Sequence, residues 1–199
     1  MKIIGITGGV GAGKSTVLNF LKEMCDCEIV MADDVAKDLM KKGGVLTETA
    51  YSLFGDDAYL DNGNINAALV AGIIFSDAAI RKKWENAVHP AVREDILNRI
   101  SDADIDGKKY FFLEAALLIE NNYQEICSEI WYVYADEDLR RIRLRETRNY
   151  TDDKIAGIFK AQMKDVEYRE YASFVIDTGI DLENTRKQLE NKLEEYETL

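Results

Sequence analysis

The chain has 199 residues, of which 47% are hydrophobic and 31% are charged, and its formal net charge is −12. This composition is typical of a globular protein that buries one core, with room for inserted subdomains. The acidic surplus repels a polyanion, so we expect no nucleic-acid partner. No apolar run reaches the ~20 residues that span a bilayer, so we expect no membrane segment, a cytoplasmic location, and a monomer or weak oligomer.

The three cysteines, Cys25, Cys27 and Cys127, are an odd set without a disulfide framework. The Cys25-x-Cys27 spacing raises the question of a metal, but a closed metal site needs about four ligands and the chain has a single histidine. We therefore expect buried or half-buried thiols.

A phosphate-binding pattern follows the first predicted strand, which runs from Ile3 to Ile6. Residues 8–15 read GGVGAGKS and satisfy G-x-x-x-x-G-K-[ST], and helical apolar spacing follows from residue 16 to residue 21. Backbone N–H groups of such a loop turn inward around phosphate oxygens, and the helix N-terminus adds partial positive charge. We expect Lys14 to reach the β- and γ-phosphates of a nucleoside triphosphate and Ser15 to hold Mg²⁺. The predicted ATP contacts in this segment are Gly8, Gly9, Val10, Gly11, Ala12, Gly13, Lys14, Ser15 and Thr16.

Four more apolar runs predict strands, at residues 28–32, 110–113, 130–134 and 174–176. Between the second and third strands the pattern is mainly helical, broken by glycine and asparagine turns, and residues 181–196 predict an amphipathic helix that docks on the sheet. Alternation of strands and helices favours a parallel sheet covered on both faces. The predicted fold class is therefore α/β, a P-loop NTPase-type parallel sheet flanked by helices, with a helical insertion and a helical lid.

Five arginines occupy nine positions between the last two strands, at 140, 141, 143, 145 and 148. One interpretation is a solvated helix face with acidic partners. The other is a mobile lid that closes over transferred phosphate, because phosphoryl transfer depends on positioning and charge neutralisation. For a lid we expect arginines that lack fixed partners until phosphate binds.

Several stretches match one family in order and spacing over nearly the whole chain. They are residues 5–16, 32–33, 54–55, 62–63, 74–77, 88–93 and 117–120, Gln162 and residues 175–177. On these residues the chain resembles the dephospho-CoA kinase family, P-loop kinases that phosphorylate the ribose 3′-hydroxyl of dephospho-CoA. The resemblance implies ATP and dephospho-CoA as substrates, with Mg²⁺ as cofactor. It also implies a core of residues 1–35, 108–135 and 172–199, an acceptor-binding helical insertion of residues 36–107, and a lid of residues 136–171.

Two carboxylates at strand ends are candidates for catalysis and metal binding. Asp33 follows the second predicted strand, where open α/β sheets bind ligands, and it could accept the proton of an acceptor hydroxyl. Its alternative is a helix N-cap, a role that suits Asp34 better. Glu114 ends the third predicted strand and could contact Mg²⁺ through water, or it could be a solvated carboxylate.

The resemblance also suggests further substrate contacts, although each has a structural alternative. His89 and Arg93 would lie one helical turn apart and contact the acceptor or pack the helix, and Phe75 lies in the block that would receive the pantetheine-bearing substrate. From the lid, Arg141 and Arg145 are predicted to act in catalysis and Arg148 to contact ATP.

The chain departs from the family pattern at Met31, Ala67, Ala116, Ile158 and Ser173. These departures leave two alternatives open. One is a P-loop kinase with another nucleoside or nucleotide acceptor, and the other is a non-catalytic ATP-binding regulator of the same fold.

Overall fold

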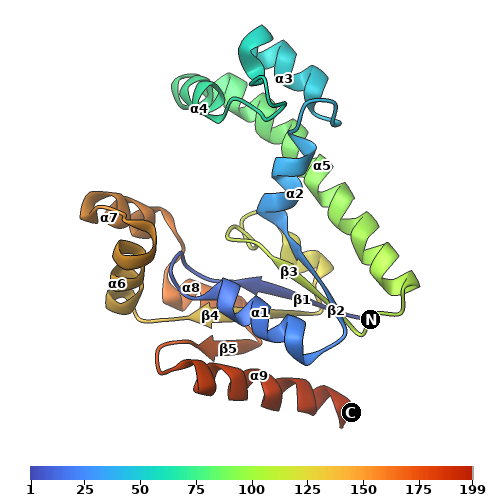
Figure 1. The fold of residues 1–199 in the computed structure, drawn as a ribbon, viewed down its shortest axis with the longest axis vertical. Helices are drawn as coiled ribbons and strands as arrows, with labels where there is room; N and C mark the ends of the chain where they lie inside the picture. Colours follow the sequence, from blue (N-terminus) through green and yellow to red (C-terminus); the bar gives the residue numbers. More distant parts are fainter. Residues whose placement is uncertain (199) are drawn as a thin grey trace. The chain divides into compact units, whose positions relative to one another are not determined.

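The computed structural model describes residues 1–198 and divides the chain into two compact units (Figure 1). The first unit combines residues 1–29 with the chain from residue 103 onward, and the second unit is residues 30–102. Among residues 1–198 no helix is both long and apolar enough to cross a membrane.

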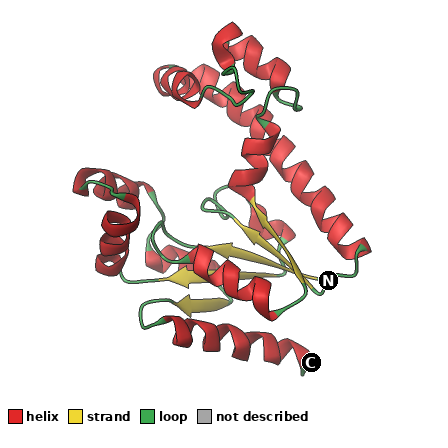
Figure 2. Ribbon diagram, viewed as in Figure 1, coloured by secondary structure: helices red, strands yellow, loops and turns green. Residues whose placement is uncertain are grey.

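A five-stranded sheet is the centre of the fold (Figure 2). Its strands are β1 (Lys2–Thr7), β2 (Cys27–Met31), β3 (Tyr110–Glu114), β4 (Glu129–Tyr134) and β5 (Phe174–Asp177). They follow the order β2-β3-β1-β4-β5, and β1 pairs in parallel with both β3 and β4, as β4 does with β5. Every residue of β3 is buried, as expected for a parallel strand covered on both faces. The predicted fold class and all five predicted strands are confirmed, with ends that shift by one or two residues.

Helices of the first unit cover this sheet. They are α1 (Lys14–Met24), α6 (Glu137–Arg148), α7 (Asp152–Ala161), α8 (Asp165–Tyr171) and α9 (Leu182–Glu197), with a short 3₁₀ helix η2 (Tyr123–Ile126). Helices α1 and α9 lie side by side, and α9 begins where the Asp181 carboxylate accepts the backbone N–H of Asn184 (Figure 1). The predicted C-terminal helix is confirmed, and Leu189 and Leu193 bury its apolar face in the core.

The second unit is helical, as the pattern of residues 35–99 predicts. It holds α2 (Ala32–Leu39), α3 (Thr47–Phe54), η1 (Asp56–Ala58), α4 (Ala67–Ser76) and most of α5 (Ala78–Ile105). Its own core includes Leu46, Phe54, Val70 and Trp84, and the rings of Phe54 and Trp84 meet edge to face at 5.0 Å. A separate apolar core lets this block pack without residues from the sheet.

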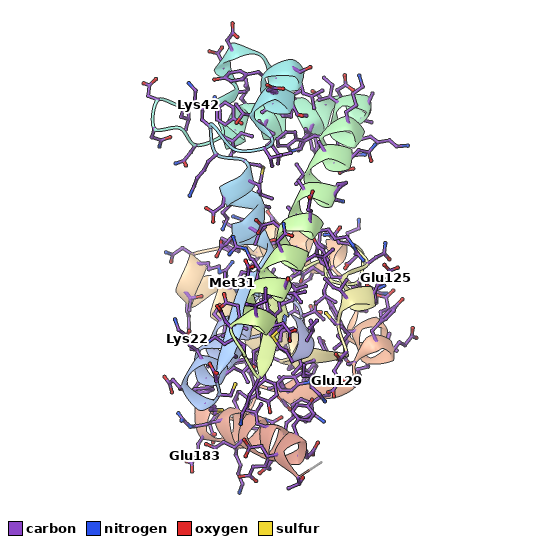
Figure 3. The ribbon with its side chains drawn as sticks, turned by 90° about the vertical axis from the view of Figure 1, so that its right-hand side faces the viewer. Lys22, Met31, Lys42, Glu125, Glu129 and Glu183 are labelled. Carbon is purple, nitrogen blue, oxygen red and sulfur yellow. The ribbon has the colours of Figure 1, made fainter. Side chains whose placement is uncertain are left out.

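One carboxylate ties three elements of the first unit together at the amino end of β4. Glu129, labelled in Figure 3, accepts hydrogen bonds from Lys2 Nζ at 2.7 Å, Tyr196 OH at 2.5 Å and Trp131 Nε1 at 3.3 Å. Lys2 Nζ also lies 3.5 Å from the centre of the Tyr196 ring. Burial alone would raise the pKa of Glu129, but these hydrogen bonds outweigh it and hold the pKa below its usual value. The cluster therefore fastens β1 and β4 to the last turn of α9.

We predict that Glu129→Gln lowers the free energy of unfolding by about 1–3 kcal/mol at pH 7, because its donors lose a charged acceptor. A carboxylate whose pKa is depressed in the folded state stabilises the protein above its unfolded pKa of ~4.3, and this contribution is lost as the pH falls through the folded pKa. The difference between wild type and variant should therefore narrow below about pH 4. Urea unfolding followed by circular dichroism at each pH measures it.

The matched control is Glu194→Gln on the exposed side of α9, which should change stability by no more than about 0.5 kcal/mol. A loss in Glu129→Gln that is equal at neutral and acidic pH would contradict the role of the charge.

Candidate functional site

The loop of residues 8–13, between β1 and α1, has a backbone that glycine makes possible. Gly8 has φ +149° and a Cβ atom there would lie 2.4 Å from the Val133 carbonyl oxygen, so any side chain would collide with β4. Gly13 has φ +95° and occupies the N-cap position of α1, where no side chain caps the helix. The first N–H groups of α1 are therefore open to an anion.

Lys14 folds back over the loop. Its Nζ donates a hydrogen bond to the Gly8 carbonyl oxygen at 2.8 Å and lies 3.6 Å from Glu114 Oε1. Glu114 ends β3, opposite Ile6 of β1, and is only 8% exposed. The interpretation of Glu114 as a solvated carboxylate is thus wrong, because the strands beside it exclude water. A buried cation and a buried anion face each other at the mouth of the loop.

Arg140 of α6 holds the loop from outside. Its Nε donates to the Val10 carbonyl oxygen at 3.0 Å, and its Nη2 donates to Gln162 Oε1 at 2.9 Å. Gln162 Oε1 also accepts the Val10 N–H at 3.2 Å, so both polar groups of Val10 are bound by this pair. The guanidinium lies 4.4 Å from the centre of the Phe159 ring, and burial lowers its pKa from the usual value. A Cβ atom on Gly9 would lie 2.2 Å from Arg140 Nη2, so this glycine makes room for the arginine.

Arg143, one turn further along α6, reaches the loop through Thr178 after β5. Arg143 donates to Thr178 Oγ1 at 2.9 Å and to the Thr178 carbonyl oxygen at 2.7 Å. Thr178 Oγ1 in turn donates to the Ala12 carbonyl oxygen at 2.6 Å. Thr178 is 6% exposed, so this chain of hydrogen bonds is protected from water. The loop is thereby fixed to β5 as well as to α6.

The expectation that the arginines lack fixed partners is wrong. Besides Arg140 and Arg143, Arg141 donates to Glu137 at 2.8 Å, Arg145 donates to Asp152 at 2.7 Å, and Arg148 hydrogen-bonds to Tyr150. Acidic and polar neighbours on α6 and in the segment after it supply these partners. The structure thus places Arg141, Arg145 and Arg148 in contacts outside the phosphate loop, and their predicted roles stay predictions.

The sequence does carry a signal for the arginines that touch the loop. Leu144 is buried and packs close to Gly11, so it marks the inward face of α6. Arg140 and Arg143 stand four and one residues before it and share that face. Sequence reasoning missed Arg140, Arg143 and Thr178 as loop contacts because it treated the arginine run as one group.

Asp33 and Asp34 lie inside α2 rather than before it. The N-cap position of α2 is Met31, and no side chain caps the helix there. The prediction of Asp34 as the cap is wrong, because β2 runs directly into α2 and Asp34 instead pairs with Lys37 at 2.6 Å. The cap alternative for Asp33 fails for the same reason. Asp33 is an exposed residue of the first turn, two positions after the end of β2.

The other predicted substrate contacts lie in the second unit. His89 and Arg93 stand one turn apart on α5, on either side of Pro90, with His89 exposed and Arg93 half-buried. Phe75 near the end of α4 is 92% exposed, whereas its neighbours Ile73 and Ile74 pack against the core of this unit. The roles of His89, Arg93 and Phe75 in binding stay predictions.

Comparisons with known proteins agree on one family. A family model described as dephospho-CoA kinase matches residues 2–184. A dephospho-CoA kinase from Streptococcus pneumoniae is 35% identical over 178 residues, which are 89% of this chain and 88% of that protein. One from Listeria innocua is 34% identical over 197 residues, 98% of this chain and 97% of that protein. A crystal structure of TT1252 from Thermus thermophilus has a TM-score of 0.83 at 27% identity, covering 98% of this chain and 97% of that one.

Proposed function

The chain belongs to the dephospho-CoA kinase family, and on this premise we propose that it transfers the γ-phosphoryl group of ATP to the ribose 3′-hydroxyl of dephospho-CoA, giving CoA and ADP. The observation that carries this proposal is the position of Lys14, a buried cation at the mouth of a glycine loop whose backbone is fixed from outside. Catalysis of phosphoryl transfer consists mainly of positioning and charge stabilisation, and this arrangement supplies both.

Lys14 is the residue best placed to hold the β- and γ-phosphates. Its present partners are the Gly8 carbonyl oxygen and the Glu114 carboxylate, which are both acceptors. A phosphate oxygen is a stronger acceptor than a carbonyl, so we expect the ammonium to exchange Gly8 for the nucleotide. Arg140 and Arg143 keep the loop in the shape that receives it, and we propose that Arg141, Arg145 and Arg148 reach the phosphates when residues 136–171 close as a lid.

Mg²⁺ fits the oxygen donors at this place. Ser15 is the second residue of α1 and offers a hydroxyl, and Glu114 offers a carboxylate beside Lys14. Both are hard ligands, and Mg²⁺ bound with a nucleotide takes its other ligands from phosphates and water. Among residues 1–198 no cluster of three or more His, Cys, Asp or Glu side chains is present. We propose that Ser15 binds the ion directly and that Glu114 contacts it through water, and that the ion would neutralise charge developing on the transferred phosphoryl group.

The acceptor belongs to the helical second unit in this proposal. Asp33, at the start of α2, would accept the proton of the 3′-hydroxyl, and His89, Arg93 and Phe75 would contact the rest of dephospho-CoA. Asp33 suits this role because it is exposed and because neither a cap nor an ion pair at hydrogen-bonding distance involves it among the described residues. We keep residues 1–35, 108–135 and 172–199 as the proposed core and residues 36–107 as the proposed acceptor-binding insertion.

We also propose a cytoplasmic enzyme that acts as a monomer or weak oligomer. Cys25, Cys27 and Cys127 are all free thiols, and free thiols are typical of a reducing compartment.

We predict that ADP release follows the acceptor and depends on Lys14. A coupled assay with dephospho-CoA, AMP, adenosine and water should give the fastest release with dephospho-CoA, by about tenfold or more over the others. Lys14→Ala should lower this rate on the order of 10²-fold or more, because it removes the cation from the phosphates. The matched control is Lys22→Ala on the exposed side of the same helix (Figure 3), which should stay within about twofold.

Other outcomes of this assay identify the alternatives. Faster release with AMP or adenosine than with dephospho-CoA would mean a kinase with another acceptor. ATP binding without release above that seen with water would mean a nucleotide-binding regulator. Equal rates for Lys14→Ala and Lys22→Ala would contradict the site itself.

For Asp33→Asn we predict a turnover number lowered by about 10²-fold or more with little change in ATP affinity, because an amide of the same shape cannot take a proton. Asp34→Asn is the matched control, since it removes only an exposed ion pair with Lys37 and should leave turnover within about twofold. Steady-state kinetics and thermal unfolding of both variants measure the effects. An Asp33→Asn protein that melts early but turns over normally would show a structural role instead.

A further inference from the structure

Two of the three thiols meet where α1 ends and β2 begins. Cys25 directly follows α1 in extended conformation, with φ −144° and ψ 158°, and Cys27 is the first residue of β2. Residues two apart in extended backbone point to the same side. Accordingly, Sγ of Cys25 lies 3.2 Å and Sγ of Cys27 lies 3.7 Å from the same oxygen, the carbonyl of Leu21, and the two thiols hydrogen-bond to each other.

The backbone allows a bond between these sulfur atoms. Extended residues two apart have Cα atoms about 6.6 Å apart, from a rise of ~3.3 Å per residue. Cα atoms joined by a disulfide lie within about 4.4–6.8 Å of each other. A disulfide that spans Asp26 alone is therefore reachable with a small local adjustment. Both cysteines are half-buried, so a small reagent can reach them.

The two thiols differ in their readiness to ionise. The S–H of Cys25 hydrogen-bonds to a Cys27 thiolate and Lys108 lies near it, which together hold the pKa of Cys27 below its usual value against burial and the charges of Asp26 and Glu28. The same bond, burial and the charges of Cys27 and Asp26 raise the pKa of Cys25, which Lys109 only partly offsets. Lys108 and Asp26 form an ion pair at 2.7 Å, so their charges largely balance. A thiolate is the attacking species in disulfide exchange, and Cys27 is the one that supplies it.

We propose that Cys25 and Cys27 form a dithiol that exchanges with small-molecule disulfides. The Cys27 thiolate attacks one sulfur of the disulfide, the S–S bond breaks, a thiolate leaves and a mixed disulfide forms on Cys27. Cys25 then loses its proton to solvent and attacks the Cys27 sulfur, which expels the second thiolate and closes the Cys25–Cys27 disulfide. Two electrons pass from the protein to the small disulfide, which becomes two thiols.

This site is separate from the phosphate loop. Lys14 begins α1 and Cys25 follows its last residue, so the two ends are about 16 Å apart at 1.5 Å per residue. The exchange therefore does not depend on the proposed kinase activity, and either can fail without the other.

The test uses the reduced full-length protein with 2-hydroxyethyl disulfide, a neutral probe chosen because the charges around the pair balance. Intact-protein mass spectrometry should show wild type losing two hydrogen atoms and keeping no adduct. Cys25→Ser should keep one mercaptoethanol adduct on Cys27, because the resolving thiol is gone. Cys27→Ser should react about tenfold more slowly or less, since its remaining pair member is the poorer thiolate.

Cys127→Ser is the matched control, because burial raises the pKa of Cys127 to about 12 and this thiol stands alone. It should react as wild type does. In wild type, acid quenching at early times followed by peptide mapping should find the first adduct on Cys27, which tests the order of attack without any substitution.

First adducts on Cys25 or Cys127 would overturn the proposal, as would a Cys27→Ser variant that reacts at the wild-type rate. A stable adduct on wild-type Cys27 that never closes to a disulfide would also overturn it, because the resolving step would be absent.

Discussion

The hydrogen bonds that fix the carbonyl oxygens of the phosphate loop are the constraint on which the functional part of this structure depends. The carbonyl of Val10 is bound by Arg140, and the carbonyl of Ala12 is bound by Thr178, which Arg143 holds. In a planar trans peptide the C=O and the N–H point in opposite directions. The N–H groups of the following residues, Gly11 and Gly13, are thereby turned away from α6 and β5. A loop built in this way presents donors to an anion before the anion arrives.

The same contacts make the sheet, the loop and α6 one unit. Val133 of β4 packs against Gly8, Thr178 follows β5, and Leu144 of α6 packs against Gly11. Glycine is required at these positions because a neighbouring backbone or side chain already fills the space. The buried ion pair of Lys14 and Glu114 then lies on a fixed frame, and fixed charges cost little reorganisation when the reaction proceeds.

How far the sequence predicts this arrangement depends on the range of each interaction. The glycine loop, the five strands and the C-terminal helix follow from local pattern, and the structure confirms them. The partners of individual arginines do not, because five similar side chains on one helix are sorted only by what packs against each face. Asp34 shows the same limit: its predicted cap needs a break between strand and helix, and β2 and α2 have none.

The departures from the family pattern fall on positions that the structure fills by other local means. Ser173 donates two hydrogen bonds to the Ile130 carbonyl oxygen, from its backbone N–H and its hydroxyl, at the start of β5. Asn66 caps α4 just before Ala67, and the Ile158 carbonyl accepts the N–H of Gln162, which holds Arg140. These substitutions therefore keep the local backbone in place. Their effect on the acceptor is a question of the second unit.

Amide hydrogen exchange of residues 9–13 in the ligand-free protein tests the central claim most directly. The account predicts that Arg140→Ala speeds exchange in this loop by about tenfold, since it removes two charged hydrogen bonds worth roughly 1.5–3 kcal/mol each at most. Its neighbour Arg141→Ala removes the same charge from the same helix but only a contact with Glu137, and should leave the loop within about twofold of wild type. Equal acceleration in both variants would contradict the claim, because the loop would then respond to charge alone and not to the hydrogen bonds that hold it.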